Sequence, residues 1–295
     1  MVQRVSKSII ACTIDYKESA LVRLKTSGIS GYTLCDCKTL SHGLDSLASG
    51  NDKRLLSKLK GYCGAWKEEM LAFSISAESL LPLPTCFPVD ASADESQEYC
   101  RIEAGYFLNN PEEYGCDIAS YANDQTRGNN RLLLFYPAEP CRKVTANFSD
   151  NHQMLFTGTA QLPLVYLSKF TEVPQVILEL ENNSVLLTIS RNGVIEKLSF
   201  HHVKNREEAE YFTMRELMEN PICQTTALQV TGTRADRAMM LLIAGETSLP
   251  PLPLSIPPSL SISNPQRFST SSPTVVKAIS TALMALAEQE ELFQS

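Results

Sequence analysis

The chain opens with a pattern of apolar and β-branched residues that predicts three antiparallel strands. Ser8 to Ile14 is almost continuously apolar, Ala20 to Lys25 alternates apolar and polar residues, and Tyr32 to Cys37 forms a third run. Short polar or glycine-containing connections separate these runs, which is typical of a β-meander. The spacing of leucines then predicts a helix over residues 52–62, and a short buried strand is expected over residues 70–76.

A second and clearer meander begins at Val176. The runs Val176 to Leu180, Ser184 to Ser190 and Val194 to His201 are rich in β-branched residues. Asn192-Gly193 joins the last two runs, and this pair tolerates the positive φ angles of a two-residue hairpin turn. The elements expected after this meander are a helix over 207–218, a strand over 227–231, a helix over 234–243 and an amphipathic closing helix over 275–291.

The stretch from about residue 80 to residue 121 differs in composition from the strands before it and is expected to be an insertion. Prolines crowd its start, and the helix predicted from about Ala91 to Phe107 is acidic. Pro111 follows, and since a proline cannot continue a helix, the helix is expected to end before it. Further strands are expected over 114–121, 131–136 and 144–148.

The two meanders, each followed by alternating helices and strands, predict an α/β protein with a duplicated architecture. The first lobe is expected to span residues 1–170 and to contain the insertion at about 80–121. The second is expected to span residues 171–295, with the closing helix 275–291 packing back on the first lobe. The meanders share negligible sequence identity, so the repeat is one of architecture. The alternative, that an α/β chain of this length contains two meanders by chance, stays open at this point.

The composition is that of an ordinary globular protein, with 43% hydrophobic and 20% charged residues among 295. A formal charge of −7 argues against nucleic acid as a partner, since phosphate binding needs clustered Lys and Arg. The nine cysteines are odd in number and scattered, so we expect their thiols to be reduced. Asp15 interrupts the first apolar run, so we expect no secretion signal. No apolar run approaches the length of about 18 residues that a membrane span needs. The sequence therefore predicts a cytoplasmic protein, and any membrane role is expected to come through a partner.

Four segments resemble the actin-like ATPase superfamily. The run Ile9 to Asp15, which ends in an acid, resembles its opening strand and first phosphate loop, and Val176 to Glu181 resembles its second phosphate strand. Gln229 to Thr233 resembles the strand and glycine turn at the adenosine site, and Leu81 to Tyr121 resembles the insertion of the PilM-like proteins of type IV pilus assembly. The resemblance implies a two-lobed actin-like fold, a duplicated RNase H-like unit with an inserted small subdomain. Uncharacterised bacterial proteins with the same fold fit these segments equally well.

The two loops that would hold phosphate depart from the pattern of active relatives, which resembles Asp-x-Gly. Glycine allows backbone N–H groups to approach phosphates closely, and the acid orders magnesium. Asp15-Tyr16-Lys17 keeps the acid and lacks the glycine, whereas Glu179-Leu180-Glu181 has a carboxylate in the glycine position. At an effective dielectric of about 20, a carboxylate about 4 Å from a phosphate charge is repelled by about 4 kcal/mol, or roughly three powers of ten in affinity.

By this resemblance, a degenerate nucleotide site would consist of Asp15, Lys17, Glu179, Gly232 and Thr233. Lys17 supplies a cation that partly offsets the repulsion, and Gly232 permits close approach on the side of the base. The other interpretation, which the sequence favours, is that the acids are polar turn residues at the ends of strands. No cofactor is therefore expected, and ATP with magnesium belongs to the alternative interpretation.

No motif in the sequence points to catalysis. Neither a Gly-x-Ser-x-Gly nucleophile turn nor a Walker loop is present. Cys35 and Cys37 share one face of a strand, but a structural zinc needs four ligands and no second Cys/His pair lies at a suitable spacing. His201 and His202 are neighbours on a strand, so their side chains point to opposite faces. No catalytic residue and no metal ligand is therefore predicted.

The residues and the resemblance together predict a non-catalytic actin-like scaffold or adaptor, a pseudo-ATPase of a bacterial type IV pilus or secretion-type inner-membrane platform. The resemblance implies that such a protein docks the cytoplasmic segment of a membrane-anchored pilus or secretion protein beside the insertion, near Ala104 to Tyr121. The alternative, from a different functional class, is a nucleotide-binding actin-like ATPase or a filament-forming protein.

We predict that ATP with magnesium does not raise the melting temperature of the purified protein, because Glu181 repels the phosphates. Thermal denaturation with and without millimolar ATP measures this. The Glu181→Gly variant is the comparison, since it should gain ATP binding if the site is a decayed nucleotide site. A rise of several degrees in the unaltered chain would contradict the prediction.

Overall fold

The computed structural model describes residues 8–27, 31–48, 52–66, 69–122, 129–247 and 250–292. The chain divides into two compact units. Unit 1 comprises residues 1–76, 139–166 and 256–295, and unit 2 comprises residues 77–138 and 167–255. In this division the insertion clusters with unit 2 and the closing residues 256–295 cluster with unit 1.

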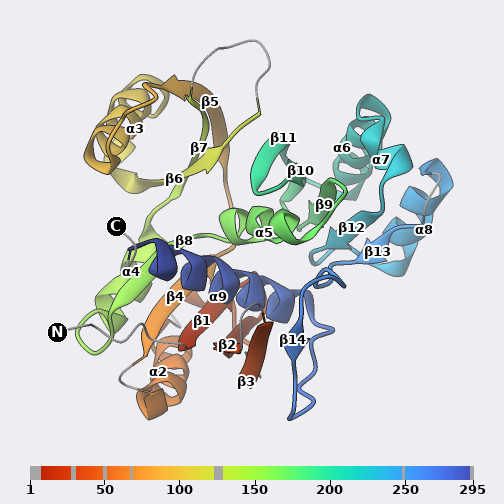
Figure 1. Ribbon diagram of the computed structural model, residues 1–295. Coiled ribbons are helices and arrows are strands. Elements are labelled where there is room, and N and C mark those ends of the chain that lie inside the picture. Colours follow the sequence, from red (N-terminus) through yellow and green to blue (C-terminus); the bar gives the residue numbers. More distant parts are fainter. Residues whose placement is uncertain are drawn as a thin grey trace. The chain divides into compact units, whose positions relative to one another are not determined.

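A six-stranded sheet forms the centre of unit 1, with the strand order β14-β3-β2-β1-β4-β8 (Figure 1). β1 lies antiparallel to β2, with Ser8 opposite Lys25, and parallel to β4, with Ile9 opposite Met70. The opening meander predicted from the sequence is confirmed as the first three strands. The strands are β1 (Ser8–Ile14), β2 (Ser19–Ser27), β3 (Gly31–Leu40), β4 (Met70–Ile75), β8 (Met154–Thr159) and β14 (Ile262–Ser263).

Helix α9 (Pro273–Leu292) packs along β1, β2 and β4, and its first turns are buried at almost every position. Within the described residues, no helix is both long and apolar enough to cross a membrane. The other helices assigned wholly or mainly to unit 1 are α1 (Leu44–Ala48), α2 (Asp52–Cys63), η1 (Gly64–Trp66), α4 (Glu139–Phe148) and α5 (Gln161–Leu167).

The strand predicted over residues 144–148 is wrong, because these residues form the end of α4. The buried residues of this helix are Cys141, Val144 and Phe148, which recur at the three- and four-residue spacing of a helix face. The helix contacts β4 and β8, and the Phe148 ring lies 5.0 Å from the Phe73 ring of β4. Val144 to Phe148 alone is too short to reveal this periodicity, which becomes clear only when Cys141 is included.

Unit 2 contains a five-stranded sheet with the order β11-β10-β9-β12-β13. The meander predicted from Val176 onward is confirmed, with Val185 of β10 opposite Leu180 of β9. Its hairpin turn has positive φ angles at Asn192 (54°) and Gly193 (79°), as the Asn-Gly pair predicts. The strands are β9 (Gln175–Leu180), β10 (Ser184–Arg191), β11 (Val194–His202), β12 (Leu228–Thr231) and β13 (Leu252–Pro253).

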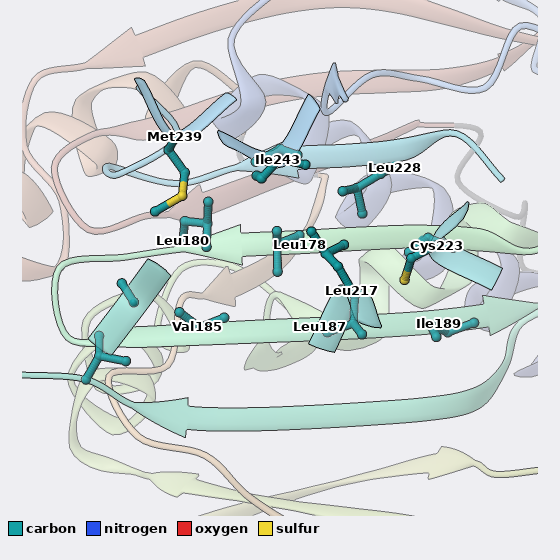
Figure 2. Close-up of a cluster of buried hydrophobic side chains, with 14 residues drawn as sticks. Leu178, Leu180, Val185, Leu187, Ile189, Leu217, Cys223, Leu228, Met239 and Ile243 are labelled. Carbon is teal, nitrogen blue, oxygen red and sulfur yellow. The ribbon is translucent and has the colours of Figure 1, made fainter. Parts of the chain in front are cut away.

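A buried hydrophobic cluster joins this sheet to its helices (Figure 2). Alternate residues of β9, such as Leu178 and Leu180, point into it, so their neighbour Glu179 points to the opposite face. The helices contribute Leu217, Cys223, Met239 and Ile243. The helices of unit 2 outside the insertion are η3 (Ser168–Phe170), α6 (Arg206–Glu219), α7 (Ile222–Thr225) and α8 (Arg237–Glu246).

The insertion is a three-stranded sheet covered by one long helix. The strand order is β5-β7-β6, and α3 packs Cys100 and Ala104 against Phe135 and its neighbours. The elements are β5 (Leu81–Phe87), α3 (Ala93–Phe107), η2 (Pro111–Glu113), β6 (Tyr114–Ser120) and β7 (Asn129–Pro137). The expected helix and the expected strands over 114–121 and 131–136 are confirmed.

Sequence analysis missed strand β5 because prolines interrupt it. Pro82 and Pro84 pair with Leu134 and Leu132 of β7, at the edge of the three-stranded sheet. Residues two apart in a strand direct their backbone nitrogens to the same side. Both prolines can therefore turn the side that lacks an N–H away from β7, the arrangement in which an edge strand tolerates proline.

Backbone contacts explain why the insertion clusters with unit 2. Tyr121 forms a parallel bridge with Ile195 of β11, and the N–H of Ala122 donates to the carbonyl of Ile195 at 2.8 Å. Nε2 of His202 lies 3.4 Å from Oγ of Ser79. The last strand of the second meander therefore contacts the insertion both before β5 and after β6.

We predict that Leu178→Ala lowers the free energy of unfolding by about 2–5 kcal/mol, because it leaves a cavity between the sheet and its helices. Leu178 is 0% exposed. Urea unfolding followed by circular dichroism measures the loss. Val173, which is 60% exposed, provides the control. Val173→Ala should cost no more than about 0.5 kcal/mol, and equal losses would contradict the assignment of the core.

Candidate functional site

Asp15 lies directly after β1, where the chain leaves the sheet, and its side chain is buried. The turn closes with the N–H of Asp15 donating to the carbonyl of Glu18 at 2.9 Å. The carboxylate oxygen Oδ1 accepts from the N–H of Tyr16 at 3.0 Å and from Oγ of Ser76 at 2.7 Å. Ser76 follows β4, so the acid joins the ends of two neighbouring parallel strands.

The second oxygen of Asp15 forms an ion pair with a lysine of the closing helix. Nζ of Lys277 donates to Oδ2 at 2.9 Å, and Oγ1 of Thr274 donates to the same oxygen at 3.3 Å. The Lys277 side chain is 1% exposed and that of Asp15 is 10% exposed. Unit 1 therefore supplies its own cation to the carboxylate. Lys17, the cation expected here from the sequence, is exposed.

Burial by itself raises the pKa of the Asp15 carboxyl, since it disfavours the charged form. The Lys277 ammonium and the hydrogen bonds from Ser76 and Tyr16 outweigh this effect, so the pKa is lowered below its ordinary value. The carboxylate thus stays ionised inside the unit. Its stabilising contribution is present above the ordinary Asp pKa of about 4 and is lost as the pH falls through the depressed pKa.

The glycine turn of unit 2 is tied closely to the end of β9. Gly232 has a φ of 106°, and a Cβ at this position would lie 2.3 Å from the carbonyl oxygen of Leu180. The next residues continue the contact, because the N–H of Arg234 donates to the same oxygen at 2.9 Å. Only glycine meets both requirements, which are left-handed backbone geometry and the absence of a side chain.

The carboxylate of Glu181 accepts hydrogen bonds from donors of this turn. Its Oε2 accepts from the N–H of Thr233 at 3.1 Å and from Oγ1 of Thr233 at 2.8 Å. The Glu181 side chain is buried, as is that of Glu179, which lies opposite Thr231 in the parallel pairing of β9 and β12. Backbone N–H groups of such turns are the donors that bind phosphates in many proteins. In this turn, one of them already binds a carboxylate of the same unit.

The five residues predicted for a nucleotide site fall into two groups. Asp15 and Lys17 belong to unit 1, and Glu179, Gly232 and Thr233 belong to unit 2. Within unit 2 the structure brings Thr233 to Glu181, and within unit 1 it brings Asp15 to Lys277. Sequence analysis missed Lys277. The signal that could have revealed it is a lone lysine among apolar neighbours, Val275 to Ile279.

The adjacent histidines point to opposite faces, as predicted. Nε2 of His201 lies 2.7 Å from Oε1 of the buried Glu216, and its ring stacks on Phe212, whereas His202 lies near Ser79. Cys35 and Cys37 are half-buried free thiols. Among the residues that the structure describes, no three His, Cys, Asp or Glu side chains form a group that could hold a metal ion.

Comparison with known proteins identifies the fold. No family model and no curated protein sequence matches the chain. A solved PilM–PilN type IV pilus biogenesis complex matches it with a TM-score of 0.70 and 14% identity, over 96% of this chain and 99% of that chain. A Bacteroides thetaiotaomicron protein with an actin-like ATPase fold and unknown function matches with a TM-score of 0.54 and 10% identity, over 95% and 98%.

The chain therefore has the actin-like ATPase fold. The α/β actin-like architecture predicted from the sequence, and its likeness to PilM, are confirmed. At these levels of identity the likeness establishes the fold and leaves the activity open.

We predict that Lys277→Met lowers the free energy of unfolding at pH 7 by about 3–5 kcal/mol, because Asp15 remains buried without its counter-charge. The double variant Asp15→Asn/Lys277→Met should recover much of the loss, since no charge is left unpaired. Chemical denaturation measures both. The deficit of Lys277→Met should shrink as the pH falls from about 4 through the depressed pKa of Asp15, because the contribution of the pair in the unaltered chain is lost over this range.

The exposed pair of Arg215 and Glu219 provides the control, with a separation of 2.8 Å. Arg215→Met should cost no more than about 1 kcal/mol, because a solvated ion pair contributes little. If Lys277→Met cost as little as Arg215→Met, the ion pair at Asp15 would not be a structural one.

Proposed function

We propose that this chain is a non-catalytic actin-like scaffold of a bacterial type IV pilus or secretion-type platform, which binds the cytoplasmic segment of a membrane-anchored partner. The observation that carries the proposal is the likeness to the PilM–PilN type IV pilus biogenesis complex, which extends over 96% of this chain and includes the insertion. The protein would be cytoplasmic, and its partner would hold it at the inner membrane.

The Asp15–Lys277 pair supports the non-catalytic part of this proposal. A magnesium ion would have to compete with a buried ammonium at 2.9 Å, and both carboxylate oxygens already accept hydrogen bonds. Releasing the acid would break the buried ion pair with Lys277, and breaking a buried pair is strongly unfavourable. In the same way, a phosphate at the second loop would have to displace Glu181 from Thr233.

Nucleotide binding is the second candidate, because the glycine turn at Gly232 is retained with its left-handed backbone. Replacement of Glu181 by glycine separates the two candidates. The variant frees the N–H of Thr233, so it should bind ATP if the turn is a decayed nucleotide site and should remain inert if the turn is only structural.

We predict that crosslinking in the source cell, followed by separation of membranes, recovers the protein with a protein that has one membrane span. Mass spectrometry should assign the crosslinks to the cytoplasmic segment of that partner. Recovery only in the non-membrane fraction, with crosslinks only between copies of this chain, would contradict the scaffold. As a control for trapped cytoplasmic protein, an unrelated tagged cytoplasmic protein should not appear with the membranes.

A further inference from the structure

The acidity of the protein is concentrated in the insertion. Residues 77–121 contain nine acidic residues and a single basic one, Arg101, so this segment alone carries a formal charge of minus eight. The whole chain carries −7, which leaves the remaining residues almost neutral. The segment contains β5, α3 and β6, so the negative charge belongs to one subdomain.

Helix α3 also exposes apolar side chains. Ile102 is 47% exposed, Tyr106 is 80% exposed and Phe107, at the end of the helix, is 56% exposed. Helix α3 lies against the three-stranded sheet (Figure 1). Its residues Cys100 and Ala104 pack in the core between them, so Ile102 and Tyr106 lie on the opposite face. Exposed apolar side chains gathered in one place are a common mark of an interaction surface.

The charged and apolar residues of this face follow one another along the helix. Glu95, Glu98, Ile102 and Tyr106 are spaced by three, four and four residues, which places them on one stripe. The stripe is acidic toward the start of α3 and apolar toward its end. We use the term α3 stripe for these four residues.

The exposed apolar residues of α6 differ from this pattern. Tyr211 and Met218 are 62% and 74% exposed, but the basic Arg215 lies between them on the same side of the helix. Charges of both signs also flank them, as in the pairs Arg206–Glu210 and Arg215–Glu219. That surface therefore selects no particular sign of partner. Glu98 of the α3 stripe also forms an ion pair, with Arg101 at 3.2 Å, but Arg101 is the single basic residue among residues 77–121, so the acidic sign prevails there.

We propose that the α3 stripe docks a basic amphipathic segment of another protein, with Lys or Arg side chains against Glu95 and Glu98 and apolar side chains against Ile102 and Tyr106. This inference rests on the proposed function and names the chemistry of the partner segment. Cytoplasmic segments next to a membrane span carry an excess of Lys and Arg, so a membrane-anchored partner offers the complementary charge.

The acidic half and the apolar half of the α3 stripe are expected to affect different rates of binding. The charge of the whole insertion attracts a basic segment over a distance of about 10 Å at moderate salt, which raises the association rate. The aromatic and aliphatic side chains then exclude water at the contact and set the dissociation rate. Binding should therefore weaken with salt and should also depend on Ile102 and Tyr106.

Fluorescence anisotropy tests the proposal with a labelled synthetic peptide of Lys and Leu, in which the leucines follow helical spacing. A matched peptide with Glu in place of Lys is the first control. We expect the Lys peptide to bind and the Glu peptide not to bind. The double variant Ile102→Ser/Tyr106→Ser should weaken binding by about tenfold or more, and Glu98→Gln should weaken it mainly at low salt.

The double variant Tyr211→Ser/Met218→Ser is the matched control, because it removes two exposed apolar side chains from another helix. It should leave the affinity within about twofold, as expected for residues outside the interface. Equal losses from the α3 and α6 variants would overturn the proposal, and so would equal binding of the two peptides. Circular dichroism and thermal melting check that each variant is folded.

A photo-crosslinking residue at position 106 or at position 211 separates this inference from the proposed function. Recovery of a membrane-anchored partner from either position supports the scaffold. Crosslinks from position 106 to a Lys- or Arg-rich segment of that partner support the α3 stripe. Crosslinks from position 211 alone would overturn the α3 stripe while the scaffold stands, and absence of a membrane partner from both positions would overturn both.

Discussion

The buried ion pair between Asp15 and Lys277 joins the beginning of the chain to its end across 262 positions of sequence. It fixes α9 at the point where β1 and β4 end, because Ser76 and Thr274 donate to the same carboxylate. A buried pair of this kind adds little net stability over an apolar pair, but loss of either partner is costly. The closing helix and the central strands of unit 1 therefore depend on each other.

The same pair constrains what the first loop can bind. An acid that serves magnesium must be able to face the ion, whereas Asp15 is buried among four donors of its own unit. In unit 2, Glu181 has a similar relation to the turn at Gly232. The fold is thus retained while polar groups at the strand ends are used for internal contacts. This is consistent with the proposed scaffold, in which the acidic insertion would supply the binding surface.

The strands of the second meander could be predicted because their signal is local. Alternating side chains and an Asn-Gly turn are visible within a few residues, and β9, β10 and β11 follow them closely. The errors arose where a local signal was ambiguous. Pro82 and Pro84 interrupt the pattern of an edge strand, so the strand is not evident from the sequence. Val144 to Phe148 has too few residues to distinguish a strand from the end of a helix.

The sequence by itself determined the strands of the two meanders, the acidic character of the insertion and the residues that could line the strand ends, because periodicity and charge are properties of neighbouring residues. Only the tertiary structure decided what those residues contact. The sequence around Asp15 is the same whether its carboxylate faces solvent or a lysine 262 positions away. The sequence around Glu181 likewise does not reveal that Thr233 donates a hydrogen bond to it. The partner of a charged group depends on which surfaces pack together, and packing joins parts of the chain that share no local pattern.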